Sequence, residues 1–540
     1  MGTSMFRHPR NRMAVALVTL AGGCMAISSG TSAAEVCPRP AANMLYPNEI
    51  PGVAIPAGQI DAAVARVDEL ARELMVSSGI PGMAVAVVVD GKLVFAQGYG
   101  VRSVNADGKV DANTVFQLAS LSKPIGATVV ARQVGQGVVQ WDTPLQRSMP
   151  SFQLADPYVS AHVTIGDMYA HRSGLPDHAG DLLEDLGYDR TQMLQRLRYI
   201  PLTPFRAGYA YTNFGMTAGA QAVAMASGTD WESLSDKVLY TPLGMTSTSS
   251  RYADFAGRAN HAVAHIKTSD GYRITPAQRR PDAQSPAGGV SSSVNDMARW
   301  MIMVLDQGCA NGQSLIDSGA LRDAVSPHAV SAPPSSPQAR GGFYGYGFNV
   351  SDSAAGRVVL SHSGAFNLGA ATAFSLIPSA RVGIVTLTNA QPIGLPETLN
   401  AEFADLVQFG RITQDWKSLY AGAFARFLSP EGSLVGKPPP SNPKPARPLS
   451  EYAGSYDNTF YGPATVTVTG GKLTLTLGPA RIQLQLSHWD GDVFVFAPPG
   501  ESQSAGSISK ATFGKGNALT IEYLDGEQQG TFCRSGACRS

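Results

Sequence analysis

Strand-like segments on both sides of a long helical region are the feature that most constrains the fold of this chain. Helical periodicity dominates from about residue 123 to about residue 305, and short apolar runs typical of buried strands flank it. Asp90-Gly91-Lys92 joins the first two runs and is typical of a tight hairpin. The runs are 83–89, 93–96, 358–361, 371–377 and 382–388. We therefore predict an α+β fold, with one antiparallel sheet completed by sequence-distant strands and a helical insertion between them.

A proline-rich stretch divides the chain into two parts. Residues 436–448 hold six prolines, which suit neither a helix nor a central strand, so we expect a stiff, extended linker. After this linker, strict alternation of apolar and polar residues surrounds Gly470-Gly471, as in a hairpin. We predict a main domain at 35–435 and a small all-β domain at 449–540, either a sandwich or a barrel.

The first 34 residues are typical of an export signal. Three arginines within residues 7–12 precede an apolar stretch at 13–27 and the small residues Ser32-Ala33-Ala34. We predict a signal peptide at 1–34 and a periplasmic or secreted protein. Lipoprotein anchoring at Cys24 is the less favoured alternative, because no large aliphatic residue stands three places before it. No later apolar run is long enough to span a bilayer, so we predict no membrane span after signal removal.

Four cysteines follow the predicted signal, an even number that suits disulfides in an oxidising compartment. Cys533 and Cys538 bracket a short, turn-like segment, so we expect them to pair with each other. Cys37 and Cys309 are then the remaining pair. We predict a structural role for all four.

Charge and ligand patterns exclude several function classes. Basic and acidic residues number 41 each, so no basic footprint points to nucleic acid as a partner. His261 and His265 are four apart and would share one face of a helix, but no third metal ligand accompanies them. We therefore predict no metal and no other cofactor.

Ser120-Leu121-Ser122-Lys123 is a candidate nucleophile with its base. A serine needs a group that removes its proton, and positions three apart lie on one face of a helix. Lys123, if buried near other cations, can become a neutral base. Pro124 is tolerated only in a first helical turn, which places Ser120 at or just before a helix start. Such a tetrad occurs by chance about once in a chain of this kind, and Ser120 alone could be an ordinary N-cap.

Two further motifs, in the expected order along the chain, make a chance match of the tetrad a poorer explanation. Tyr211-Thr212-Asn213 follows a loop; a tyrosine near Lys123 and a second cation can ionise and shuttle a proton, and Asn213 can orient an amide. His362-Ser363-Gly364 lies on a predicted strand, where glycine lets a ligand lie flat. The next N–H, from Ala365, can aim at a developing oxyanion. The alternatives are a core tyrosine, a turn asparagine and a histidine satisfied within the sheet.

As a set, these elements resemble the serine β-lactamase-related superfamily, which includes class C β-lactamases, penicillin-recognising D-peptidases, D-aminopeptidases and related esterases. The resemblance covers about residues 60–410 and implies a β-lactamase/transpeptidase-like fold. Within the matching stretches, we interpret His171 as a structural residue. The tail resembles a lipocalin-like β domain that some relatives append. Other matching stretches are Gly79-Ile80-Pro81-Gly82, His171-Arg172-Ser173-Gly174-Leu175-Pro176, Pro242-Leu243-Gly244-Met245, Pro286-Ala287-Gly288-Gly289 with Asp296, Tyr452-Ala453-Gly454-Ser455-Tyr456 and Leu486-Ser487-His488-Trp489.

The resemblance also implies roles for individual residues. Ser120 would be the acylated nucleophile, and Lys123 and Tyr211 would move the proton. The backbone N–H groups of Ser120 and Ala365 would form the oxyanion hole. The expected substrate-binding residues are Asn213, His362, Ser363, Gly364 and Ala365. Efficient class C enzymes have lysine where this chain has His362, which is only partly charged at neutral pH, so the departure favours peptidase or esterase chemistry.

We thus expect an exported serine hydrolase that acts on a small-molecule or peptide substrate. Small amides or esters, including peptides with D-residues, are the expected substrates. A class C-like β-lactamase and a non-catalytic, penicillin-binding-like regulatory module are the alternatives. A module that only binds has no need to retain Ser120, Lys123 and Tyr211 together. We expect the C-terminal domain to shape substrate access without supplying chemistry.

Overall fold

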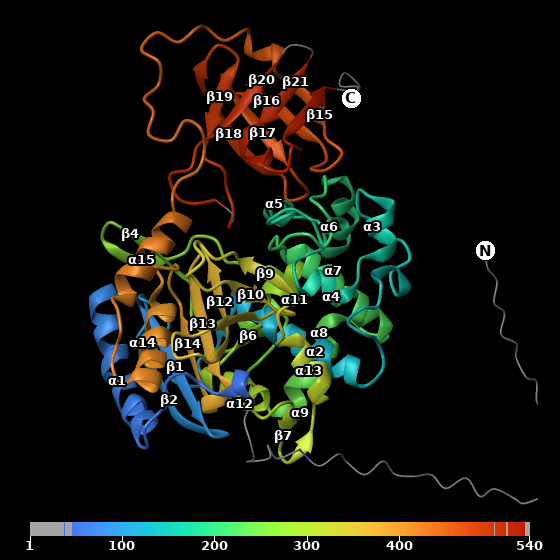
Figure 1. Ribbon diagram of the computed structural model, residues 1–540. Coiled ribbons are helices and arrows are strands. Elements are labelled where there is room, and N and C mark those ends of the chain that lie inside the picture. Colours follow the sequence, from blue (N-terminus) through green and yellow to red (C-terminus); the bar gives the residue numbers. More distant parts are fainter. Residues whose placement is uncertain (1–36, 38–45, 502, 515–516, 535–540) are drawn as a thin grey trace, which may run out of the picture.

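The computed structural model describes Cys37 and residues 46–534, apart from 502 and 515–516 (Figure 1). The predicted signal peptide and Cys24 lie outside the described residues. So does Cys538, and its pairing with Cys533 stays a prediction. Within the described part of the chain, no helix is long and apolar enough to cross a membrane.

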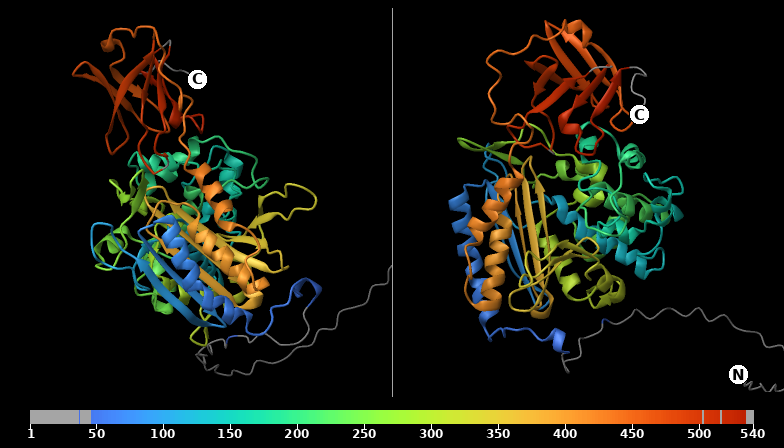
Figure 2. Two further views of the ribbon diagram at one scale, coloured as in Figure 1. Left: turned by 90° about the vertical axis from the view of Figure 1, so that its left-hand side faces the viewer. Right: turned by 45° about the horizontal axis from the view of Figure 1, so that its top comes forward.

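An eight-stranded antiparallel sheet forms the centre of the main domain (Figures 1 and 2). The predicted hairpin at its start pairs through β1 with β14, which lies about 300 positions later, with Met83 opposite Thr388. Sequence-distant strands therefore complete the sheet, as predicted. In spatial order its strands are β2 (Lys92–Gly100), β1 (Gly82–Val89), β14 (Val382–Thr388), β13 (Ala370–Ile377), β12 (Val358–Phe366), β11 (Asn349–Asp352), β10 (Gly342–Tyr344) and β9 (Ala329–Ala332).

Helices cover both faces of this sheet, and β1 shows why its sequence is apolar without alternation. Met83, Val85 and Val87 join a core with α1 and α14, whereas Ala84 and Ala86 join the core on the opposite, helical side. The larger helical part lies between β2 and β9 in sequence, as predicted. The helices are α1 (Gln59–Ser78), α2 (Ser122–Gly135), α3 (Pro157–His162), α4 (Ile165–Tyr169), α5 (Asp181–Asp185), α6 (Arg190–Arg196), α7 (Asn213–Ala226), α8 (Trp231–Ser235), α9 (Thr241–Leu243), α10 (Tyr252–Gly257), α11 (Ser285–Gly288), α12 (Val294–Leu305), α13 (Ser318–Ala324), α14 (Leu395–Phe409) and α15 (Trp416–Phe427).

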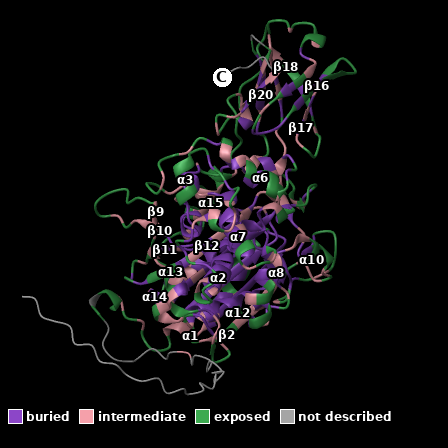
Figure 3. Cartoon of the chain, turned by 90° about the vertical axis from the view of Figure 1, so that its right-hand side faces the viewer, coloured by how far each residue is buried: buried purple, intermediate pink, exposed green. Residues whose placement is uncertain are grey.

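α2 and α7 are buried over most of their length and pack against each other and against α11 (Figure 3). Gly126 of α2 and Gly219 of α7 let the helices approach their neighbours closely, since an added Cβ would lie 3.2 Å from the Trp231 ring or 3.1 Å from Met168. These two helices carry the candidate site residues at their N-terminal ends. The site residues therefore stand at the ends of two buried, closely packed helices.

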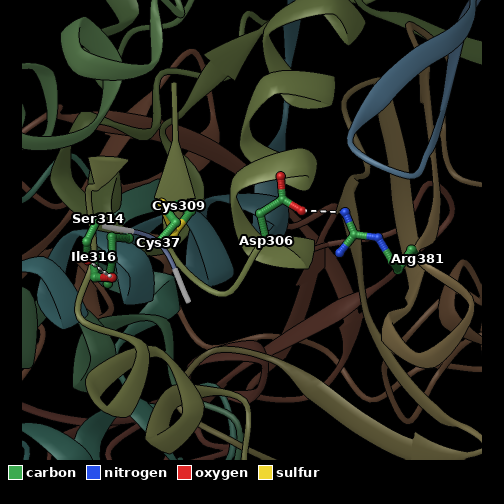
Figure 4. Close-up of a disulfide and its surroundings, with 6 residues drawn as sticks. All are labelled: Cys37, Asp306, Cys309, Ser314, Ile316 and Arg381. Carbon is green, nitrogen blue, oxygen red and sulfur yellow. Dashed lines mark hydrogen bonds and ion pairs between the residues drawn. A yellow bond between two sulfur atoms is a disulfide. The ribbon is translucent and has the colours of Figure 1, made fainter. Parts of the chain in front are cut away.

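A disulfide ties the start of the described chain to the end of α12 (Figure 4). Cys37 is bonded to Cys309, which confirms the predicted pairing. Nearby, Asp306 at the end of α12 forms an ion pair with Arg381, 2.6 Å apart. The ion pair holds the end of α12 against the turn between β13 and β14, and the disulfide attaches the start of the described chain to the segment after α12.

The C-terminal domain is a closed eight-stranded barrel, so the prediction of a sandwich or a barrel resolves to a barrel. The pairing of β15 with β22 closes it, with Tyr456 opposite Arg534. The barrel stands above the main sheet and the helical part (Figures 1 and 2). Its strands are β15 (Gly454–Asp457), β16 (Ala464–Thr469), β17 (Lys472–Leu477), β18 (Ile482–Asp490), β19 (Val493–Phe496), β20 (Ser509–Phe513), β21 (Ala518–Ile521) and β22 (Thr531–Arg534).

The proline-rich stretch contains neither helix nor strand, but it is bonded to the barrel along part of its length. The Lys444 N–H donates to Asp490 at 2.7 Å, and Arg447 forms an ion pair with Asp492 at 2.9 Å. Upstream of it, the Ile508 N–H donates to the Glu431 carbonyl at 2.9 Å. The segment from Glu431 onward therefore belongs structurally to the barrel.

Candidate active site

Ser120 stands in a strained turn at the start of α2. A 3-10 turn at Ala119–Leu121 leads directly into α2, and Ala119 has a φ of 48°, a left-handed conformation that is costly for alanine. The Ser122 hydroxyl holds the turn, because it donates to the Ala119 carbonyl at 2.6 Å and accepts from the Val290 N–H at 2.9 Å. Ser120 is therefore fixed at the helix start, as predicted.

Lys123 points its amine at the Ser120 hydroxyl. The Lys123 Nζ lies 3.1 Å from Ser120 Oγ, 2.7 Å from Asn213 Oδ1 and 3.0 Å from the Ala287 carbonyl oxygen. The side chain is completely buried. In the neutral amine, two N–H bonds serve the Asn213 and Ala287 oxygens, and the lone pair is left facing Ser120.

Burial lowers the pKa of Lys123 to about 7, against a smaller opposing effect of the Asp181 carboxylate. The neutral amine is thus well populated near neutral pH. The sequence-based expectation named burial near other cations; burial lowers the pKa as expected, and no neighbouring cation is among its causes. A neutral Lys123 amine at this distance can accept the Ser120 proton.

Tyr211 and Asn213 approach the same hydroxyl from the start of α7. The Tyr211 hydroxyl donates to Ser120 Oγ at 2.7 Å, and the Lys123 ammonium stands 4.4 Å from the centre of the Tyr211 ring. Burial raises the pKa of Tyr211 well above its usual value. Tyr211 is therefore a neutral donor in this resting site, contrary to the expectation that it can ionise, because desolvation outweighs the opposing hydrogen bond with Ser120.

Asp181, at the start of α5, supports the site from behind. Its Oδ2 accepts from Asn213 Nδ2 at 2.8 Å and contacts His178 Nδ1, also at 2.8 Å. These bonds fix the Asn213 amide so that its oxygen faces Lys123. The amide of Asn213 is thus held at both ends before any substrate arrives.

The strand β12 brings a backbone edge against the Ser120 turn. A Cβ added at Gly364 would lie 2.3 Å from the Leu118 carbonyl oxygen and 3.0 Å from the Ser120 nitrogen, so only glycine permits this approach. Ala365 follows in the same strand, opposite Ala371 of β13. Gly364, the residue before Ala365, thus lies against the Ser120 backbone, an approach compatible with N–H groups of Ser120 and Ala365 that face one oxyanion.

His362 is uncharged, contrary to the expectation of a partly charged imidazole. Burial, followed by the Lys123 charge, lowers the pKa of His362 to about 3. Its Nδ1 contacts the Ser363 carbonyl oxygen at 2.7 Å, and its Nε2 contacts the Tyr344 hydroxyl at 2.9 Å. A carbonyl only accepts, so Nδ1 carries the proton and the Tyr344 hydroxyl donates to Nε2. Both ring nitrogens are engaged, which leaves no cationic group at this position for a substrate carboxylate.

Ser363 turns its side chain away from the nucleophile. Neighbouring residues of a strand point to opposite faces, and the Ser363 hydroxyl bonds the buried Glu397 carboxyl of α14. That carboxyl has a pKa raised by burial to about 7. A contribution of Ser363 to substrate binding would therefore come from its backbone.

Several supporting residues escaped the sequence analysis. Asp181 and Tyr344 reach the site through tertiary packing, and no local spacing marks them. Ala287 belongs to a stretch that matches the family, but the contact of its carbonyl with Lys123 was not predicted. His171, interpreted as structural, accepts from the Thr212 N–H at 3.1 Å and lies against the Tyr211 ring. Its role as a buried support agrees with that interpretation.

The two histidines considered for a metal do not share a helix. His265 begins the short strand β4 (His265–Thr268), because its backbone pairs with β5 (Gly271–Ile274). Its ring bonds the Val104 N–H and the Asn389 carbonyl oxygen. No group of three or more metal-ligating side chains occurs among the residues that the structure describes.

Comparison with known proteins identifies relatives of both domains. A family model described as Beta-lactamase matches residues 67–409, and one described as Domain of unknown function (DUF3471) matches residues 438–528. "Unguisins hydrolase ungD" of Aspergillus violaceofuscus is 27% identical over 461 residues, which cover 77% of this chain and 79% of that protein. The "D-alanyl-D-alanine-carboxypeptidase/endopeptidase AmpH" of Escherichia coli is 26% identical over 240 residues, covering 44% of this chain and 60% of that protein.

A solved structure shares the fold. The octameric penicillin-binding protein homologue from Pyrococcus abyssi superimposes with a TM-score of 0.55 at 18% identity, over 85% of this chain and 98% of the other. At this identity the likeness concerns the fold alone.

Proposed function

Because the chain belongs to the β-lactamase family and is a serine hydrolase of that superfamily, we propose that Ser120 forms an acyl-enzyme in the hydrolysis of small amides or esters. Peptides with D-residues are included among the proposed substrates. One observation carries the proposal. The Ser120 hydroxyl is contacted at once by a buried lysine amine at 3.1 Å and by a tyrosine hydroxyl at 2.7 Å.

The geometry supports a definite sequence of proton movements. Neutral Lys123 takes the Ser120 proton as Oγ attacks the substrate carbonyl, and the N–H groups of Ser120 and Ala365 stabilise the oxyanion. Tyr211, whose hydroxyl already donates to Oγ, is placed to pass a proton to the leaving group and to recover it from Lys123. For deacylation, the same pair takes a proton from the attacking water and returns one to Ser120 Oγ as the acyl–oxygen bond breaks.

The state of His362 bears on the choice among substrates. A β-lactam or a C-terminal peptide presents a carboxylate, and a neutral imidazole with both nitrogens engaged offers it no ion pair. Uncharged esters and amides do not need that partner. Esterase-like or amidase-like hydrolysis is therefore favoured over efficient β-lactam turnover.

We further propose that the chain is exported to the periplasm or secreted. The arginine-rich and apolar start of the sequence supports this, and so does the Cys37–Cys309 disulfide, since disulfides persist in oxidising compartments. A fusion of residues 1–40 to a reporter that is active only after export would test this part separately.

The test of the main proposal is direct detection of the acyl-enzyme. Exposure to a fluorophosphonate probe and to p-nitrophenyl acetate should add one adduct to Ser120, located by mass spectrometry of the peptide. Ser120→Ala should lose the adduct and lower kcat by several orders of magnitude, as removal of a nucleophile does. Ser122→Ala is the control for the position of the label: the adduct should stay on Ser120, and it should form more slowly because two bonds that hold the Ser120 turn are lost. An adduct that persists in Ser120→Ala would refute the assignment.

A further inference from the structure

The loop between β19 and β20 reaches down from the barrel to the rim of the active site. Glu501 in this loop is hydrogen-bonded to the turn that follows β12. Its carboxylate accepts hydrogen bonds from the N–H groups of Asn367 and Leu368, the latter at 3.1 Å. Its own carbonyl accepts from Asn367 Nδ2 at 3.0 Å. One barrel residue therefore satisfies three donors of a turn that begins two residues after Ala365.

This turn is connected by packing to the nucleophile. Phe366, the last residue of β12, forms a separate buried cluster with Ala119 and Ala370. Ala119 is the strained residue directly before Ser120. The contacts run from Glu501 through the β12 turn and Phe366 to Ala119, and so touch both backbone segments that supply the proposed oxyanion hole.

The same loop also contacts α5, on the opposite side of the site. The Glu501 N–H donates to Asp185 of α5 at 3.1 Å, the helix that carries Asp181. Gly500 has a φ of +111°, and a Cβ there would lie 2.4 Å from the Asp185 carboxylate, so the approach requires glycine. The loop thus bridges α5 and the end of β12.

Buried charges strengthen this bridge. Arg279 forms an ion pair with Glu184 at 2.5 Å and lies 4.0 Å from Asp185, with all three side chains at most 10% exposed. Its guanidinium also stacks over the Phe366 ring, 5.2 Å from the ring centre. Burial raises the pKa of Glu501 to about 8, against the opposing effect of Arg279. Glu501 thus lies half-buried in a charged junction between the barrel and the main domain.

We propose that Glu501 is a positioning residue for catalysis. Its hydrogen bonds attach the turn after β12 to the barrel and so set the spacing between the backbones of Ala365 and Ser120. The inference rests on the proposed acyl-enzyme function. It goes beyond a barrel that only narrows substrate access, because it makes a barrel side chain part of the support for oxyanion stabilisation. Misplacement by a fraction of an ångström at such a site lowers the rate of the chemical step.

The experiment compares Glu501→Ala and Glu501→Gln with the full-length wild type. Alanine removes every acceptor, whereas glutamine keeps one oxygen for one of the two backbone donors. We expect Glu501→Ala to lower kcat for p-nitrophenyl acetate by about tenfold with KM within about twofold, and Glu501→Gln to restore part of the loss. Rates are expressed per active site, titrated with the fluorophosphonate probe, so that unfolded protein does not count.

Gln529→Ala is the matched control. Gln529 is also a barrel residue that bonds the main domain, through its Nε2 to the Tyr199 carbonyl oxygen at 3.1 Å, but it contacts neither wall of the site. This variant should keep the wild-type kcat. Thermal unfolding of all variants separates loss of docking from loss of positioning.

Each outcome decides the question. A wild-type kcat per titrated site in Glu501→Ala, whatever its Tm, would overturn the inference, and so would a rise in KM alone. If Glu501→Ala fails to fold, the kcat of Glu501→Gln decides by the same criterion. Ser120→Ala, measured beside them, keeps the two proposals apart, because activity in that variant would refute the acyl-enzyme itself, whereas its inactivity leaves only Glu501 in question.

Discussion

The surroundings of Lys123 determine both the charge of its amine and the direction of the lone pair. As a solvated lysine it would remain protonated at neutral pH, but complete burial brings its pKa to about 7. The Asn213 and Ala287 oxygens then fix the direction of its lone pair. The base is produced by the environment of the side chain, and the sequence spacing supplies only its proximity to Ser120.

This environment predicts the pH dependence of acylation. The reactive form is the neutral amine, so kcat/KM for p-nitrophenyl acetate should rise as pH increases through about 7 and level off above it. Below that pH, Lys123 carries its proton and cannot accept another. Lys123→Met should lose most of the activity together with the rising limb. A wild-type profile that is flat between about pH 5 and pH 9 would show that another group takes the proton.

His362 allows a test of the substrate preference. His362→Lys would place a cation on the strand beside Ser120, so hydrolysis of substrates with a free carboxylate should improve relative to neutral esters. We expect the ratio of kcat/KM for a cephalosporin to that for p-nitrophenyl acetate to rise about tenfold, the equivalent of one modest ion pair. His362→Gln, which adds no charge, is the control. An equal rise in both variants would show that charge is not the reason.

At the scale of elements, the approach of β12 to the Ser120 turn is the most demanding contact. Gly364→Ala should push these segments apart, because the new Cβ would lie 2.3 Å from the Leu118 carbonyl oxygen and 2.4 Å from Thr372 Oγ1. We expect kcat to fall by about 100-fold, as when one oxyanion donor is lost. Gly208→Ala, in the loop before Tyr211, has open space around its added Cβ and should leave kcat unchanged. Normal turnover in Gly364→Ala would exclude this strand from the oxyanion site.

Comparison of the elements with the sequence shows which features could be predicted and which depend on tertiary contacts. Continuous apolar runs located β1, β13 and β14, which are apolar on both faces, but the short strands β9, β10 and β11 were not predicted. The helix start at Ser120 followed from Pro124. Closure of the barrel could not be predicted, because β15 and β22 lie at opposite ends of that domain's sequence. Asp181 and Tyr344 were missed for the same reason, since each meets its partner only through the folded chain. The neutral states of Tyr211 and His362 depend on burial, which no motif encodes.

At the scale of the molecule, the two domains share more contact than a simple linker implies. The buried apolar cluster continues from Leu186 and Tyr188 of the main domain into the barrel core, and the Tyr188 hydroxyl donates to the Tyr461 carbonyl at 2.7 Å. Glu527 accepts from the Gly180 N–H at 2.7 Å, next to Asp181. A proline-rich sequence therefore marks a change of domain here, but it does not indicate independence of the two domains.

Removal of the barrel tests how far the main domain stands alone. Because the barrel's contacts begin at Glu431, the chain should be cut after Ser429, before the proline-rich stretch. We expect residues 35–429 to fold by circular dichroism, since the central sheet and both of its helical layers remain, but with a lower Tm because the apolar contacts around Leu186 are lost. Ser120 should still react with a fluorophosphonate, more slowly than in the full chain, since the β12 turn loses its three bonds to Glu501. Labelling at the full-length rate would show that the barrel does not support the site, and an unfolded product would show that the two domains form one cooperative unit.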